Sequence, residues 1–92
     1  MLSGFNSDQP YRGRIFHVQT EDAGAYRPQV VTHLFLDGIV VTSAESDYSD
    51  RAEAPDLASR VRQLMERQHE AMLRSLQQGD WDELIRTRCA PR

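Results

Sequence analysis

The amino-acid sequence predicts an α+β protein in which a three-stranded antiparallel meander is followed by one long amphipathic helix and a short C-terminal helix. Three observations carry this prediction. Residues 11–44 alternate between apolar and polar side chains, an Asp-Gly pair interrupts that alternation at Asp37-Gly38, and residues 56–78 place their apolar side chains on one stripe. A chain of 92 residues has the size of one domain. The expected order of elements is therefore β-β-β-α-α.

The strands are expected over residues 11–22, 29–36 and 39–44, which are rich in β-branched and aromatic residues. Gly24 and Pro28 favour a turn after the first strand, and Asp37-Gly38 is typical of a two-residue hairpin turn after the second. The sequence thus predicts a domain over residues 11–86, preceded by a flexible arm at residues 1–10.

The long helix is expected to end near Gln78, because Gly79 suits the position just beyond a helix. Asp80 and Glu83 then favour the start of a short helix that includes Trp81, Leu84 and Ile85. Residues 87–92, with the lone Cys89, are expected to form a frayed tail.

Strand register predicts which side chains share a face of the sheet. We expect Phe16 to lie opposite Leu34, and Val18 opposite Thr32. The face that the long helix covers then carries Phe16, Val18, Val30, Leu34, Leu36, Ile39 and Val41. The other face is more apolar than a solvated face requires, and we interpret most of it as an interface; its residues are Ile15, His17, Val31, His33, Phe35 and Val40, with Thr42 beside them.

His17 and His33 are directly opposed in this register, with their Cβ atoms ~5 Å apart. Two imidazoles at that spacing could hold a metal ion with a third ligand, for which His69 is a candidate. The long helix covers the other face, so His69 could join them only from a second subunit or through a different fold. Polar positions on a half-buried face and a titrating interface switch are the alternatives.

No catalytic residue can be named. The glycines form neither a G-x-G-x-x-G motif nor a P-loop, and no serine lies in a nucleophile elbow. We therefore lean away from an enzyme and expect no cofactor. A net charge of −3 argues against nucleic-acid binding. One cysteine, no secretory signal pattern and no long apolar run favour a cytoplasmic protein that does not enter a membrane.

The segments RIFHVQTED, VVTHLFLDG and LMERQHEAMLRSLQQGDWD resemble a family of small uncharacterised bacterial proteins that share an F-H-V-Q-T-E-D strand and an L-M-x-x-Q-H helix. The resemblance implies a bacterial source and a free-standing domain, and no activity comes with it. It directs attention to five polar residues that mark either a site or a buried hydrogen-bond network: Gln19, Thr20, Glu21, Gln68 and His69.

The leading hypothesis is a non-catalytic protein–protein interaction module that forms a homodimer or docks another protein through the second sheet face. The alternative is a protein that binds a metal or small ligand through His17 and His33.

Overall fold

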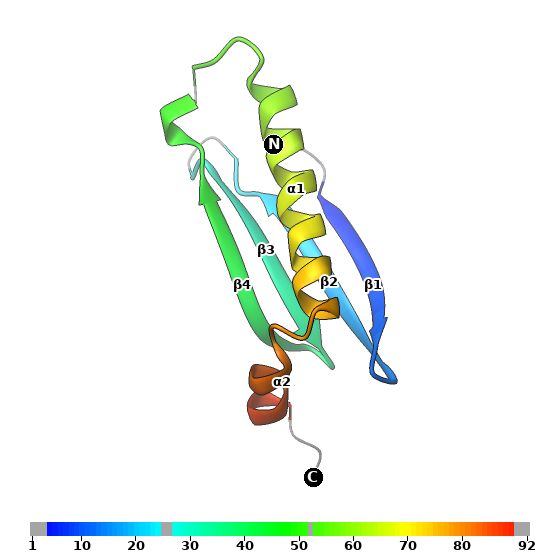
Figure 1. Cartoon of the computed structure of the whole chain (residues 1–92). Coiled ribbons are helices and arrows are strands. Elements are labelled where there is room, and N and C mark those ends of the chain that lie inside the picture. Colours follow the sequence, from blue (N-terminus) through cyan, green and yellow to red (C-terminus); the bar gives the residue numbers. More distant parts are fainter. Residues whose placement is uncertain (1–3, 25–26, 52, 90–92) are drawn as a thin grey trace.

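The computed structural model describes residues 4–24, 27–51 and 53–89. It is an α+β structure in which one antiparallel sheet of four strands, in the order β1-β2-β3-β4, packs against a long helix (Figure 1). The elements are β1 (Phe5–Tyr11), β2 (Arg14–Asp22), β3 (Gln29–Leu36), β4 (Ile39–Asp47), a 3₁₀ turn (Ser49–Arg51), α1 (Leu57–Gln77) and α2 (Asp82–Arg88).

Strand β1 corrects two predictions, because the sheet has four strands and residues 5–10 belong to it rather than to a flexible arm. The side chains that β1 turns toward the helix include the polar Ser7 and Gln9, so alternation gave no apolar signal there. Pro10 is tolerated because β1 is an edge strand. Residues 1–3 of the predicted arm lie outside the described residues.

Two tight turns join neighbouring strands of the sheet. Asp37 and Gly38 have φ angles of 52° and 79°, as the predicted two-residue hairpin requires. Arg12 and Gly13 repeat this geometry between β1 and β2, with φ angles of 50° and 79°. Gly13 was therefore the local signal for the strand that the sequence analysis missed.

The predicted register between β2 and β3 is wrong by two residues, since Val18 lies opposite Leu34 and Thr20 opposite Thr32. A shift of two residues preserves the faces, so the predicted core side chains still point toward α1. A β-bulge opposite Leu34 and Phe35 inserts an extra residue in β4. As a result Val41 and Thr42 both lie on the helix side, and Thr42 does not share the face of Val40.

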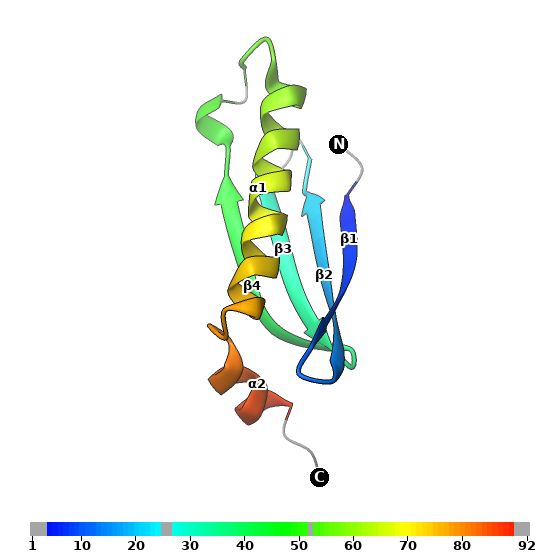
Figure 2. The ribbon, with the colours of Figure 1, turned by 45° about the vertical axis from the view of Figure 1, so that its right-hand side comes forward.

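Helix α1 crosses one face of the sheet, and neither view shows a described element over the other face (Figures 1 and 2). The core it encloses has two apolar clusters. One centres on Phe16, Leu34 and Leu76, and the other on Val30 and Met65. Ile39, which was predicted in the core, is 44% exposed.

Helix α2 extends the ordered domain beyond the predicted boundary at residue 86. Thr87 and Arg88 are helical, and Cys89 is buried against the first cluster, so this part of the predicted frayed tail is wrong. Residues 90–92 lie outside the described residues. Neither described helix is both long enough and apolar enough to cross a membrane.

Candidate functional site

The uncovered face of the sheet is the surface that the sequence analysis singled out. We call it the open face. Strand alternation and register place on it three residues of β1 (Asn6, Asp8, Pro10), four of β2 (Ile15, His17, Gln19, Glu21), four of β3 (Gln29, Val31, His33, Phe35) and four of β4 (Val40, Ser43, Glu45, Asp47). All six residues predicted for an interface are among them.

One end of the open face is apolar. Ile15 is 60% exposed and Val40 is 38% exposed, and both are among the large hydrophobic residues that the described chain leaves open. Phe35 lies directly opposite Val40 and is half-buried. Ile15 lies two residues before His17, the β2 neighbour of Phe35, so the three apolar side chains gather at the same end of the open face.

The two histidines on this face are not directly opposed, which corrects the predicted pairing. His17 lies opposite Phe35, and His33 lies opposite Gln19. Both imidazole rings flank the Phe35 ring, with centroids 6.3 Å and 5.7 Å from it. The result is an aromatic row across β2 and β3.

Each of these histidines already has hydrogen-bond partners. The Nδ1 atom of His17 lies 2.9 Å from Asp8 Oδ1, and its Nε2 atom lies 3.2 Å from Asn6 Oδ1. The Nδ1 atom of His33 lies 2.6 Å from Ser43 Oγ. His69 lies on the helix side of the sheet, so the structure does not bring the three histidines together. Among the described residues, no group of three His, Cys, Asp or Glu side chains is placed to hold a metal ion.

The other end of the open face is acidic. Glu21, Val31 and Glu45 lie side by side on adjacent strands, so a carboxylate flanks Val31 on each side. Asp47 is next along β4, two residues from Glu45. The described strands place no arginine on this face; Arg27, in the connection between β2 and β3, lies at its end with Nη2 3.5 Å from Gln29 Oε1.

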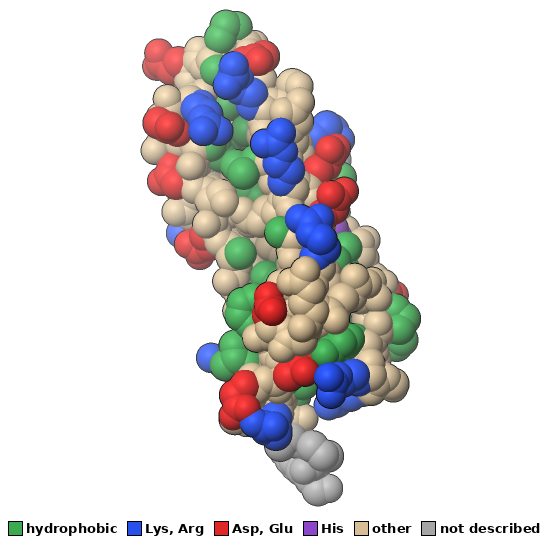
Figure 3. All heavy atoms as spheres, viewed as in Figure 1, with side chains coloured by type: hydrophobic (Ala, Val, Ile, Leu, Met, Phe, Trp, Pro, Cys, Tyr) green, Lys and Arg blue, Asp and Glu red, His purple; other side chains and the backbone are tan. Residues whose placement is uncertain are grey.

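The helix side has the opposite charge. Helix α1 carries four arginines and two glutamates, a net charge of +2. Figure 3 views the molecule from this side and shows arginine side chains along it with acidic side chains among them. The exposed apolar side chains of α1 are small, since they are those of Ala58 and Ala71.

Between sheet and helix, a chain of polar side chains crosses the core and touches all four strands. Gln68 of α1 donates from Nε2 to Thr32 Oγ1 (3.0 Å) and to the carbonyl oxygens of Val30 and Ala44 (3.1 Å each). Ser46 donates to Gln68 Oε1 at 2.5 Å. Because carbonyl oxygens only accept, these contacts fix which way the Gln68 amide points.

The rest of the chain runs through two threonines to His69. The hydroxyls of Thr20 and Thr32 lie 2.7 Å apart, and Thr20 Oγ1 lies 2.8 Å from His69 Nδ1. A threonine hydroxyl donates one hydrogen bond and accepts two, so both threonines can bond to their two neighbours at once. His69 Nε2 lies 2.8 Å from Ser7 Oγ, so both ring nitrogens of His69 have a hydroxyl partner.

This polar chain explains two of the segments that the sequence analysis singled out. Thr20, Gln68 and His69 belong to the buried network, while Gln19 and Glu21 alternate onto the open face, where Gln19 donates to Glu21 at 2.5 Å. Among the described residues, every buried side-chain polar atom has a hydrogen-bond partner. Burial lowers the pKa of His69, which favours its neutral form.

A second buried polar pair, Tyr48 and Asp22, lies at the end of the sheet where β2 and β4 finish. Tyr48 donates to Asp22 Oδ1 at 2.6 Å, and burial together with this carboxylate raises the pKa of Tyr48 to about 12. Asp22 also accepts from the backbone N–H of Gly24 at 3.0 Å, a contact that caps the turn after β2. The sheet that carries the open face therefore has its described buried polar side chains joined by hydrogen bonds.

Fold and surface together define an α+β protein with a one-sided antiparallel sheet. Comparison with protein-family models, with curated proteins and with solved structures gives no match. The resemblance to a bacterial family therefore stays a prediction, and function has to be argued from the chain itself.

Proposed function

We propose that this protein is a non-catalytic interaction module whose open face docks a cationic, amphipathic segment of another protein. The observation that carries the proposal is the composition of this face. It combines exposed apolar side chains at Ile15 and Val40 with carboxylates at its other end. No described strand contributes an arginine to this face. Uncovered apolar patches of this kind are typical of interaction surfaces.

The geometry of the face sets the spacing that a partner must match. Phe35 and Val31 are four residues apart on β3, which corresponds to about 13 Å along a strand. A partner helix covers about 12 Å in eight residues. An apolar anchor over Phe35 and an arginine or lysine some eight residues away would therefore reach the two ends together.

The row of Glu21, Val31 and Glu45 suits the cationic part of such a segment. Directly opposed residues on neighbouring strands are about 5 Å apart, so a side chain over Val31 has a carboxylate at that distance on each side. The apolar stem of an arginine can lie on Val31 while its guanidinium group pairs with the carboxylates.

A second copy of the chain is a poorer occupant. Two open faces packed with their strands in the same direction would bring the carboxylates of Glu21, Glu45 and Asp47 against the same groups of the other copy, and packed in the opposite direction would bring them against its exposed apolar end. Packing the helix side of one copy on the open face of another would match the charges. It would offer little apolar area to Phe35, because the exposed apolar residues of α1 are alanines and its leucines at 57, 64 and 73 are half-buried.

The test uses two fluorescent helical peptides that share a leucine face, one with lysines and one with glutamines in their place. We expect the lysine peptide to bind more tightly by anisotropy, with an affinity that falls as salt rises. Glu21→Gln with Glu45→Gln should weaken the lysine peptide about tenfold or more, as expected for lost contacts between charges. Glu66→Gln with Glu70→Gln on α1 is the matched control and should have no effect.

The apolar half of the proposal is tested by Phe35→Ser, which should weaken both peptides while the circular dichroism spectrum is unchanged. Equal binding of the two peptides would contradict the cationic partner. A dimer in sedimentation experiments that Phe35→Ser abolishes would replace the partner segment with a second copy.

A further inference from the structure

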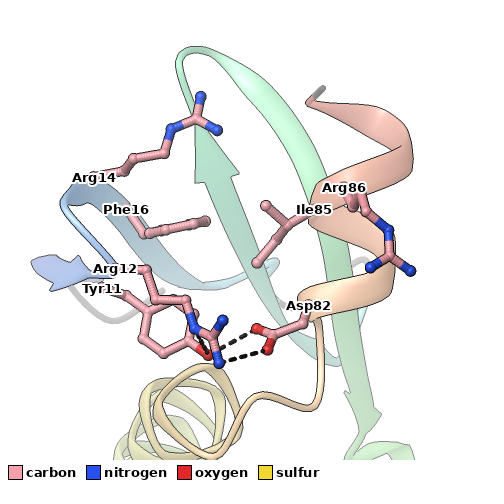
Figure 4. A pocket seen from close by; sticks show the side chains of 7 residues that line it. All are labelled: Tyr11, Arg12, Arg14, Phe16, Asp82, Ile85 and Arg86. Atoms are coloured by element: carbon pink, nitrogen blue, oxygen red, sulfur yellow. Dashed lines mark hydrogen bonds and ion pairs between the residues drawn. The ribbon is translucent and has the colours of Figure 1, made fainter. Parts of the chain in front are cut away.

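A cavity of about 260 Å³ lies between the turn that joins β1 to β2 and helix α2 (Figure 4). Phe16 of β2 and Ile85 of α2 point toward each other across it. Phe16 faces the helix side of the sheet, so the cavity is separate from the open face. No residue of this cavity belongs to the proposed docking surface.

The cavity exists because the β1–β2 hairpin holds α2 near both of its ends. At one end, Tyr11 donates to Asp82 Oδ1 at 2.7 Å, and Arg12 Nη2 lies 3.2 Å from Asp82 Oδ2. At the other end, Arg14 Nη1 lies 3.5 Å from the carbonyl oxygen of Cys89. The hairpin leaves the middle of α2 apart from β2, which is where Ile85 lies.

Of the charged side chains that line the cavity, Arg14 is the one that we consider able to pair with a ligand. Both oxygens of Asp82 are engaged by Tyr11 and Arg12, so that carboxylate is neutralised. Arg86 pairs with Glu83 on its own helix, and its guanidinium group points away from the cavity in Figure 4. Arg14 remains at the rim.

Arg14 is held by an exposed ion pair and by the long hydrogen bond to the Cys89 carbonyl oxygen. Its Nη2 atom lies 2.9 Å from Asp37 Oδ2, and the Asp37 side chain is 73% exposed. Exposed pairs of this kind contribute little free energy, so another carboxylate can replace Asp37 on Arg14. The planar guanidinium group matches a carboxylate with two parallel hydrogen bonds.

We propose that this cavity binds a small monocarboxylate with a short apolar body. The carboxylate pairs with Arg14, and the apolar body lies between Phe16 and Ile85. The cavity volume is below the range of about 300–1,000 Å³ that drug-sized ligands occupy, so the ligand is small.

The test is a titration of the ¹⁵N-labelled protein with sodium hexanoate at constant ionic strength, followed by amide chemical shifts. Hexan-1-ol, which has the same apolar body without the charge, is the control ligand. Hexanoate should shift amides of residues 13–16 and 82–89 and bind at least about tenfold more tightly than the alcohol, the effect of one charge-assisted contact.

Two charge variants give opposite expectations. Arg14→Gln should weaken hexanoate binding about tenfold or more. Asp37→Asn should strengthen it several-fold, because asparagine tolerates the φ angle of 52° at this turn and leaves Arg14 without its competing carboxylate. Arg74→Gln, which removes an exposed pair with Glu70 on α1, is the matched control and should change nothing.

Ile85→Phe fills the cavity and should abolish binding while the circular dichroism spectrum is retained. The proposal is overturned if hexanoate shifts no amide around the cavity up to its solubility limit. It is also overturned if Asp37→Asn fails to strengthen hexanoate binding. This measurement remains informative even if the Arg14→Gln variant does not fold. Shifts confined to Phe35 and its neighbours would place hexanoate on the open face and would equally overturn it.

Discussion

The Nδ1 atom of His69 on α1 lies 2.8 Å from the Oγ1 atom of Thr20 on β2. Thr20 is fully buried and His69 is 6% exposed. The contact fixes α1 against the sheet at a defined position along its length, between the two apolar clusters. Apolar packing alone tolerates small slips of a helix, whereas a buried hydrogen bond is lost if the helix moves.

Removing the Thr20 hydroxyl should destabilise the protein. Thr20→Val keeps the shape of the side chain but removes the hydroxyl that lies within hydrogen-bond distance of both His69 Nδ1 and Thr32 Oγ1, which costs about 1–3 kcal/mol of unfolding free energy. Urea denaturation measures the change. Thr42→Val, at a half-buried position on the same side of the sheet, is the control and should cost much less; equal losses would show that the network adds no stability.

The unfolding free energy should fall in mild acid because of His69. Burial lowers the pKa of folded His69 below 6.5, with Glu70 opposing this shift and His17 adding to it. Below pH 6.5 the unfolded chain therefore binds more protons than the folded protein. Stability should fall as the pH drops from 6.5 toward the folded pKa, by up to about 1.4 kcal/mol per pH unit.

Urea denaturation between pH 5 and pH 8, the range in which an ordinary histidine changes charge, measures this dependence. His69→Gln removes the titrating group and should flatten the curve in this range. Gln63→Ala, at an exposed position of α1 without a titrating group, should leave the curve as it is. A curve that His69→Gln does not change would assign the acid sensitivity to other groups.

The thiol of Cys89 should be protected while α2 is docked. Cys89 is 7% exposed and packs against the apolar cluster around Phe16. Reaction with Ellman's reagent should therefore be much slower in the native protein than in urea. A protein with Cys89→Ala and Ser59→Cys, which moves the thiol to the exposed side of α1, should react quickly in both conditions. Fast reaction of native Cys89 would contradict the docked position of α2.

The sequence predicted the α+β class and the side chains that face the helix because apolar periodicity records both. It missed β1 because Ser7 turns inward to bond with His69, a contact from a distant part of the chain. The slip in register has a similar cause. Alternation distinguishes faces but not shifts of two residues, and the length of the turn between β2 and β3 set the pairing.

The open face was predictable as a surface, since all six expected residues lie on it. Its charge pattern was not, because Glu21 and Glu45 become neighbours of Val31 only through the observed register. The cavity at α2 was also beyond the sequence. Arg12 and Arg14 were visible on either side of Gly13, but nothing local indicated that the turn would reach Asp82 and Cys89.

Docking of a cationic amphipathic segment on the open face can be observed by mapping the lysine peptide onto the ¹⁵N-labelled protein by amide chemical shifts. We expect shifts that run along β2, β3 and β4 from Phe35 to Glu21 and Glu45, with little change on α1. Shifts that concentrate on α1 or α2, or no shifts at peptide concentrations that saturate the anisotropy signal, would contradict it.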